Sequence, residues 1–563
     1  MRGKDLILIH PPSVFDFRKK PIFWGPISDT VPSTPVFEMY PLGFMTIANY
    51  LHQNHYSVEI VNLALRMMKD INFNVEKYLS SLKAKAFGID FHWLPHVQGS
   101  LEVARLLKKL HPNVPIIMGG LSATYYAQEI LEHFHQIDFI IKGDSTEEPL
   151  LYLLREIEKG KEDFSSIPNL SWRNRDGKIY HNSITYVPND LNHLSVDKWF
   201  LASFILKGML NDNHKPYYLW DKAPMAAILT CKGCSFNCVT CGGSCYTYSQ
   251  FYGRERIAFR SPKNLIEDLS IIASFTKDMP VYIIGDLRQG GNKYVEEFLS
   301  RLRNENIDIP IIFEIFTPAS KDFIDNIAKS VHTYGFTLSP ESADLEVRMA
   351  QGRHYTNDEI ERCIIHSLEA GASRFDLFFM LGLGKETEDS VQKTFKYCLK
   401  LTKAYHNKNF YTFLSTLTPS LDPGSQAFEY PFAHGFRLRY KTLLNHYHAY
   451  SMPSWAYFIN YSTQNFSSQD IVELTYRVAY FTAELRRIHS NKDEVDLIKS
   501  RIDASKLLLK KIDEIMQLKD DLKRDEELQR LTAIIQSDIG NGILHTPFEL
   551  LRALSYGYKN AQS

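Results

Sequence analysis

The residues that point most directly to chemistry are cysteines in one short segment. Four of the seven cysteines in this 563-residue chain lie within eleven positions, from Cys231 to Cys241. Three of them, Cys234, Cys238 and Cys241, have the spacing Cys-x3-Cys-x2-Cys. Three closely spaced thiolates can hold three irons of a 4Fe–4S cluster and leave the fourth iron without a protein ligand. An open iron site lets a cluster bind and reduce a small molecule, so we predict that this loop is the reactive centre.

Zinc is the main alternative for this loop, because Cys231 with Cys234, and Cys238 with Cys241, form two Cys-x-x-Cys pairs. Zinc ribbons usually separate such pairs by about a dozen or more residues, so that four sulfurs can close a tetrahedron. Here three residues separate them. The bacterial ferredoxin run Cys-x2-Cys-x2-Cys-x3-Cys does not match either. We expect Cys231 and Cys245 to be mostly structural.

Composition places the chain among ordinary globular proteins. Lysine and arginine total 64 against 65 acidic residues, which gives no global attraction to nucleic acid. Apolar residues make up 44% of the chain, and no apolar run reaches the roughly 18 residues that span a bilayer. The first residues do not resemble a signal peptide. We therefore expect a cytoplasmic protein without a membrane span, in which clustered cysteines indicate metal more often than disulfides.

Residues 1–160 alternate short apolar strands with amphipathic helices. This order is typical of an α/β domain with a doubly wound parallel sheet. Such sheets bind ligands at the carboxyl ends of their strands, and Gly119, Gly120 and Gly143 lie where strands end. No Gly-x-Gly-x-x-Gly follows the first strand, so the pattern for dinucleotide binding is weak. The expected strands are 5–10, 57–61, 86–90, 114–118 and 139–141, and the expected helices are 43–55, 75–83, 99–111 and 127–135.

Residues 221–430 alternate again and predict a (β/α) barrel or partial barrel. Function is then expected at the carboxyl ends of its strands, and the cysteine loop follows the first of them. The expected strands are 225–230, 281–284, 311–316, 334–338, 374–380 and 411–417, with helices such as 263–275 and 357–369.

The remaining segments carry less information. We expect residues 161–220 to form a connector, with a hairpin over 165–182 followed by a linker packed across two domains. Residues 431–563 predict a mainly helical region, with helices over 437–451 and 470–489 and helical spacing over 492–537. The aromatic segment 455–461 either closes one side of the active site or belongs to the core.

The cysteine loop, residues 232–241, resembles the cluster-binding motif of radical S-adenosylmethionine (SAM) enzymes. It departs from that motif at Thr240, where an aromatic residue is usual. The turn over 382–387 is similar to one that shapes the adenine pocket in this family. The resemblance implies a 4Fe–4S cluster held by Cys234, Cys238 and Cys241, and SAM as the molecule bound at its open iron. It further implies contacts to SAM from Gly285, Asp286, Glu341, Ser342 and Arg353.

Residues 5–155 resemble the cobalamin-binding domain that precedes many radical SAM domains. The likeness lies in prolines after the first strand, the Pro-Leu-Gly at residues 41–43, and glycines at later strand ends. No Asp-x-His-x-x-Gly is present, so the usual mutase-type cobalt ligand is not expected. His92 and His96 lie on a strand-end loop from which they can reach the cobalt. The implied cobalamin contacts are Asp90, His92, Gly119, Gly120, Ser122, Gly143 and Asp144.

Together these resemblances, which cover about residues 1–430, imply a cobalamin-dependent radical SAM enzyme of class B. The expected reaction is methylation of an unactivated carbon through a 5′-deoxyadenosyl radical and methylcobalamin. A cyclisation or rearrangement without methyl transfer, a non-enzymatic metal-binding protein and an RNA-modifying enzyme are the alternatives. The expected partners are an unidentified peptide, lipid, tetrapyrrole or small-molecule substrate and an electron donor such as ferredoxin or flavodoxin, with no nucleic acid.

Overall fold

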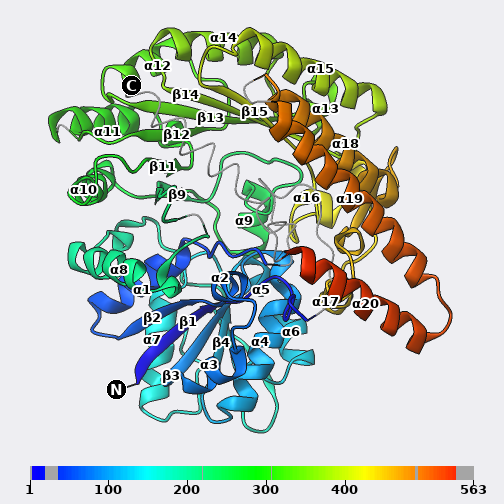
Figure 1. Ribbon diagram of the computed structural model, residues 1–563. Helices are drawn as coiled ribbons and strands as arrows, with labels where there is room; N and C mark the ends of the chain where they lie inside the picture. The colour runs from blue at the N-terminus through cyan, green and yellow to red at the C-terminus, as the bar shows by residue number, and fades with distance from the viewer. Residues whose placement is uncertain (1–2, 20–35, 219, 306, 489–491, 540–563) are drawn as a thin grey trace.

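Two α/β sheets lie one above the other in Figure 1, and helices from the C-terminal part of the chain run along one side of both. The protein was analysed as a computed structural model, which describes residues 3–19, 36–218, 220–305, 307–488 and 492–539. The predicted fold class is confirmed: a doubly wound N-terminal sheet, a partial (β/α) barrel and a mainly helical C-terminal region.

The N-terminal sheet has the order β2-β1-β3-β4-β5-β6-β7. Its first five strands are parallel, and the chain reverses direction along the sheet between β1 and β3. The hairpin predicted in the connector forms β6 and β7, which extend the sheet by antiparallel pairing on β5. The strands are β1 (Lys4–His10), β2 (Val58–Asn62), β3 (Ala84–Asp90), β4 (Ile116–Gly119), β5 (Phe139–Ile141), β6 (Leu170–Arg173) and β7 (Ile179–His181).

The four helices expected in this domain are present, and three further helices follow strands β2, β4 and β5. A side-chain cap explains the first of them, α2, because Asn62 at the end of β2 accepts a hydrogen bond from the Leu65 amide at 3.0 Å. The expected helices are α1 (Gly43–Gln53), α3 (Val75–Ser81), α4 (Val97–Leu110) and α6 (Ala127–His133), and the additional ones are α2 (Leu63–Lys69), α5 (Leu121–Tyr125) and α7 (Glu147–Glu158).

The linker predicted after the hairpin contains a helix that the sequence analysis did not expect. Residues 198–210 form helix α8 (Lys198–Leu210). Asp197 caps it, because its side chain accepts a hydrogen bond from the Phe200 amide at 2.7 Å. The helix escaped detection because its apolar residues lie on all sides and show no helical period.

The second sheet is the predicted partial barrel. All six strands are parallel and follow one another in chain order from β8 to β15, and the sheet remains open between these two edges. Helices α10 (Pro262–Ala273) and α14 (Asn357–Glu369) match the expected ones closely. The strands are β8 (Ala226–Leu229), β11 (Val281–Ile284), β12 (Ile311–Ile315), β13 (Tyr334–Glu341), β14 (Arg374–Leu381) and β15 (Phe410–Thr416).

The C-terminal region differs from expectation at its start. The helix predicted over 437–451 is wrong at its start, because residues 437 and 438 belong to β16 (Phe436–Leu438), which pairs with β17 (Tyr461–Thr463). Only α17 (Leu443–Ala449) is helical within that range. Trp455 and Phe458 are buried, so the aromatic segment contributes to the core. The remaining helices are α18 (Ser468–Arg486), α19 (Lys492–Met516) and α20 (Asp521–Ile539).

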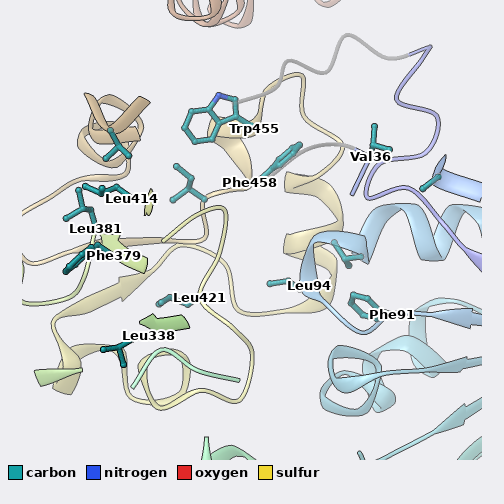
Figure 2. Packing of buried hydrophobic residues seen from close by; sticks show 14 of the residues in the cluster. Val36, Phe91, Leu94, Leu338, Phe379, Leu381, Leu414, Leu421, Trp455 and Phe458 are labelled. Carbon is teal, nitrogen blue, oxygen red and sulfur yellow. The ribbon is translucent and has the colours of Figure 1, made fainter. Parts of the chain in front are cut away.

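One buried apolar cluster runs through both domains and the C-terminal region. Figure 2 shows Val36, Phe91 and Leu94 of the N-terminal domain on one side, and Leu421 and Phe458 on the other. Side-chain hydrogen bonds reinforce this contact: the Tyr126 hydroxyl donates to the Lys441 carbonyl at 3.0 Å, and the Tyr447 hydroxyl donates to Glu102 Oε1 at 2.6 Å. The segment after β15 therefore holds the two α/β domains together.

Close packing at the carboxyl end of β1 generates a prediction. A Cβ atom added to Gly99 would lie 1.7 Å from the Pro12 carbonyl oxygen, so α4 would have to move away from the loop after β1. We expect Gly99→Ala to lower the free energy of unfolding by about 3 kcal/mol, as overpacking does. Urea denaturation measures this, with Gly43→Ala as control because nothing lies within 4 Å of its added Cβ. Equal stability of the two variants would contradict this packing.

Candidate functional site

The cysteine loop lies at the carboxyl end of β8. Cys231 and Lys232 form the short strand β9 (Cys231–Lys232), which pairs with β10 (Ala258–Phe259), and the loop turns at Gly233. Gly233 has φ +96°, and an added Cβ would lie 3.0 Å from Arg254 Cδ and 3.2 Å from Ile257 Cα. Only glycine suits both the backbone angle and the space.

Hydrogen bonds from three other elements hold the loop in place. Gln289, after β11, accepts from the Ser235 amide at 2.9 Å, and Asp422, after β15, accepts from the Gly242 amide at 3.1 Å. The Val239 amide donates to the Gln351 carbonyl at 3.2 Å. The sequence analysis did not single out Gln289 or Asp422, because a hydrogen bond over more than 50 residues leaves no local pattern.

The three predicted cluster ligands lie close enough for their charges to affect one another. Burial raises the pKa of Cys234 to about 11 and also raises the pKa of Cys238 and Cys241. The charge of Cys238 further raises the pKa of both other thiols, which shows that they are neighbours. Among the described residues, no three His, Cys, Asp or Glu side chains converge on one point as ligands of a single ion.

The predicted SAM residues Glu341 and Arg353 lie beside the cluster loop. Arg353 Nη2 donates to Glu341 Oε1 at 3.0 Å, and the Arg353 charge lowers the pKa of Cys238 against the effect of burial. Glu341 has φ +69°, a strained angle for a residue other than glycine. Arg353 Nε is buried and lacks a hydrogen-bond partner in the described part of the chain. Strain and an unused donor are both typical of a ligand site.

Other predicted SAM residues already have partners within the protein. Asp286 accepts from the Arg288 amide at 3.0 Å and from the Phe316 amide at 2.8 Å. Ser342 is buried, and its hydroxyl accepts from the Asp344 amide at 3.2 Å. The Gly285 amide donates to Glu314 Oε2 at 2.7 Å, which places a carboxyl group at this strand end that sequence reasoning missed. Burial raises the pKa of Glu314.

A hydrogen bond to its own Glu386 side chain stabilises the glycine turn over 382–387. Glu386 Oε2 accepts from the Gly382 amide at 2.6 Å, and burial raises the pKa of Glu386 to about 8. The Tyr461 hydroxyl donates to the Gly382 carbonyl at 3.2 Å. Hydrogen bonds to Glu386 within the turn and from Tyr461 in the C-terminal region therefore both hold the turn in place.

Polar groups at the ends of β1 and β3 form a buried network. His10 Nδ1 lies 2.9 Å from Asp90 Oδ1, and His10 Nε2 and His96 Nε2 lie 2.8 and 3.1 Å from the Phe37 carbonyl oxygen. Three buried atoms here, Ser13 Oγ, Asp90 Oδ2 and His96 Nδ1, have no partner among the described residues. Such atoms suit a ligand that carries amide groups, as cobalamin does.

The other predicted cobalamin residues line the next strand ends. The Ser122 hydroxyl donates to the His92 carbonyl at 3.0 Å, and an added Cβ at Gly120 would lie 2.5 Å from His92 Cα. Gly120 and Gly143 have φ +119° and +95°, whereas an added Cβ at Gly119 would meet only the Ile141 carbonyl, at 3.8 Å. Burial lowers the pKa of His92 to about 4, with a smaller effect of the Lys232 charge in the same direction. His92 therefore lies on the side of its domain that faces the cluster loop.

Ion pairs join Asp144 and Glu147, which follow β5, to Arg254 beyond α9 (Cys245–Phe251) and to Lys232 at the start of the cluster loop. Asp144, a predicted cobalamin contact, pairs with Arg254, whose Nη2 lies 3.1 Å from Asp144 Oδ1. Both side chains are buried. Glu147 Oε1 lies 3.5 Å from Lys232 Nζ, and the Lys232 charge opposes burial to keep the pKa of Glu147 low. Arg254 was missed because nothing in its local sequence marks a partner 110 residues away.

This contact yields a prediction on stability. Arg254→Gln leaves Asp144 buried without a counterion, and we expect the free energy of unfolding to fall by about 3–5 kcal/mol. Adding Asp144→Asn should recover part of that loss, because no charge then remains unpaired. Urea denaturation tests both, with Arg301→Gln as control, since its exposed pair with Glu297 contributes about 1 kcal/mol or less. A loss no larger than in the control would show that the pair does not join the domains.

Comparisons with known proteins identify both domains. A model of the B12 binding domain matches residues 30–150, and a model of the radical SAM superfamily matches residues 228–398. An uncharacterized methyltransferase of Pyrococcus horikoshii is 25% identical over 412 residues, which are 71% of this chain and 80% of that protein. The anaerobic magnesium-protoporphyrin IX monomethyl ester cyclase of Rubrivivax gelatinosus is 20% identical over 313 residues, 54% of this chain and 52% of the cyclase.

The fold is also that of a solved enzyme. The cobalamin-dependent S-adenosylmethionine radical enzyme OxsB, with aqua-cobalamin and S-adenosylmethionine bound, aligns with 100% of this chain and 79% of its own at 13% identity and a TM-score of 0.56. A radical SAM domain uses a 4Fe–4S cluster and SAM, and a B12-binding domain holds cobalamin, which confirms the three predicted cofactors. In the described part of the chain, no helix has the length and apolar character to cross a membrane. The chain combines a B12-binding domain with a radical SAM domain and is a cobalamin-dependent radical SAM enzyme.

Proposed function

We propose that this enzyme methylates an unactivated carbon of its substrate. The observation that carries the proposal is the contact of the segment after β5 with the radical SAM domain, through Asp144 with Arg254 and through Glu147 with Lys232 at the start of the cluster loop. When bound, the cluster and SAM supply a 5′-deoxyadenosyl radical, and methylcobalamin supplies the methyl group. A contact of this kind keeps the two ligand-binding strand ends at a fixed separation, which transfer between them requires.

The residues of the chain bind and orient these groups in the proposal. Cys234, Cys238 and Cys241 hold the cluster. Arg353 pairs bidentately with the carboxylate of SAM, and Glu341 accepts from its ribose hydroxyls. Further SAM contacts are proposed from Gly285, Asp286 and Ser342. Asp286 and Ser342 would have to give up some of their hydrogen bonds within the protein to contact SAM. Asp90, His92, Gly119, Gly120, Ser122, Gly143 and Asp144 are proposed to line the cobalamin side.

Apolar side chains between the domains support chemistry that must exclude water. Phe91 and Leu94 from the N-terminal domain and Leu421 and Phe458 from the other side are buried in one cluster (Figure 2). A dry, low-dielectric surrounding protects a reactive carbon radical from side reactions. The proposed substrate is a peptide, lipid, tetrapyrrole or small metabolite, and the electron donor a ferredoxin or flavodoxin.

Cyclisation without methyl transfer is the second candidate. It is favoured by the match to the anaerobic magnesium-protoporphyrin IX monomethyl ester cyclase. Methyl transfer is favoured by the match to the Pyrococcus horikoshii methyltransferase. That match covers more residues than the match to the cyclase, 412 against 313, and has a higher identity, 25% against 20%.

The cluster ligands are testable one at a time. Cys238→Ala removes one iron ligand, so after anaerobic reconstitution we expect it to hold less iron and sulfide and to form no 5′-deoxyadenosine from SAM above background. Cys245→Ala is the matched control and should keep both properties, because that thiol is not one of the three ligands. Undiminished cleavage of SAM by the Cys238→Ala variant would refute the cluster assignment.

Methyl transfer and cyclisation can be separated before the substrate is known. The reconstituted enzyme is given cobalamin, reductant and SAM with a deuterated methyl group, and the products are analysed by mass spectrometry. We expect deuterated methylcobalamin and S-adenosylhomocysteine, together with 5′-deoxyadenosine. Formation of 5′-deoxyadenosine without label on cobalamin would instead support the cyclase.

A further inference from the structure

Helix α8 exposes a stripe of large apolar side chains. Trp199, Leu206, Met209 and Leu210 are between 58% and 79% exposed. Their spacing of 7, 10 and 11 residues from Trp199 places them on one face of the helix. Single exposed apolar residues are ordinary on soluble proteins, but a contiguous stripe is typical of an interaction surface.

The opposite face of α8 is fixed to the N-terminal domain. The Phe200 ring lies 5.6 Å from the ring of His52 in α1, and the Phe204 ring lies 5.3 Å from that of His214. Leu201 packs against the main apolar cluster. In Figure 1 the helix lies at the left edge of the molecule, near α1. The stripe is thus presented outward by an anchored helix with a capped N-terminus.

The charged residues within α8 are positive, and Asp197 at its N-cap is the adjoining acidic residue. Lys198 and Lys207 are exposed, and residues 198–210 contain no aspartate or glutamate. Lys4 at the start of β1 adds a third cation, since burial and the Lys4 charge together lower the pKa of Lys207. Lys4 has an acidic neighbour in Glu59, whose Oε2 lies 3.9 Å from its Nζ. The outward face of α8 has the residue types found on the lipid-facing side of interfacial helices, namely leucines and a tryptophan with lysines at the border, while its inner face packs on the protein.

We propose that α8 docks this enzyme onto an anionic lipid surface. Trp199, Leu206 and Leu210 insert among the upper acyl chains, and Lys198 and Lys207 contact lipid phosphates. A protein partner is a poorer match, because one helix face with four apolar side chains is narrow beside the ~800 Å² that each partner buries in a standard protein complex. Docking is peripheral, since no described helix can cross the bilayer.

Vesicle co-sedimentation of the full chain tests the proposal without reference to its enzymatic activity. The probes are phosphatidylglycerol vesicles and phosphatidylcholine vesicles of equal size. We expect binding at least tenfold tighter to the anionic vesicles, weakened by salt because the lysine contribution is screened. Leu206→Gln with Leu210→Gln should weaken this binding at least tenfold. The matched control is Leu507→Gln with Leu522→Gln, which removes two similarly exposed leucines of α19 and α20 and should change binding less than twofold.

Each other outcome overturns the proposal. Absence of wild-type binding to anionic vesicles would refute it, as would equal loss of binding in the α8 variant and the control. If the wild type is a dimer by light scattering and the α8 variant a monomer, the stripe is an interface between two copies of this chain. Circular dichroism of both variants establishes that their helices remain folded.

Discussion

The buried pair between Arg254 and Asp144 joins the two cofactor-binding domains directly. Both side chains are almost fully removed from water, so each requires the other: a buried charge without a partner costs several kcal/mol. The Arg254 side chain also packs against Gly233, the residue at which the cluster loop turns. A shift of the N-terminal domain would therefore break the ion pair and disturb this turn at once. The domain contact and the shape of the loop thus depend on each other.

The same interdependence extends around the cluster loop. Its backbone is held from the end of β11 by Gln289, from beyond β15 by Asp422 and from α13 (Leu345–Ala350) through the Gln351 carbonyl. The loop follows β8 at one edge of the open sheet, and Asp422 reaches it from beyond β15 at the other edge. A partial barrel has no closing strand pair between β8 and β15, so the loop itself bridges the gap. The loop is therefore part of the barrel's structure as well as its proposed ligand site.

The strands of both sheets and the fold class could be predicted because buried parallel strands are short apolar runs ending in glycine or proline. Cys234, Cys238 and Cys241 were visible because ligand spacing is local. Arg254 and Glu314 could not be found in this way, since their partners are brought to them only by the fold. Conversely, Asp286 matched a family motif, yet its carboxylate is bonded to Arg288 and Phe316. A local motif identifies the position of a residue, but the tertiary contacts determine whether its side chain is available to bind a ligand.

Helix α8 shows why the prediction failed where it did. Amphipathic periodicity arises when one face of a helix packs on the protein and the other meets water. In α8 the inner face carries Phe200 and Phe204 and the outer face Trp199 and Leu206, so both are apolar and the period vanishes. A missing period in an apolar segment too short to cross a membrane therefore has a physical meaning. It indicates that the outer face is adapted to an environment other than water, even in a chain whose net charge is close to zero.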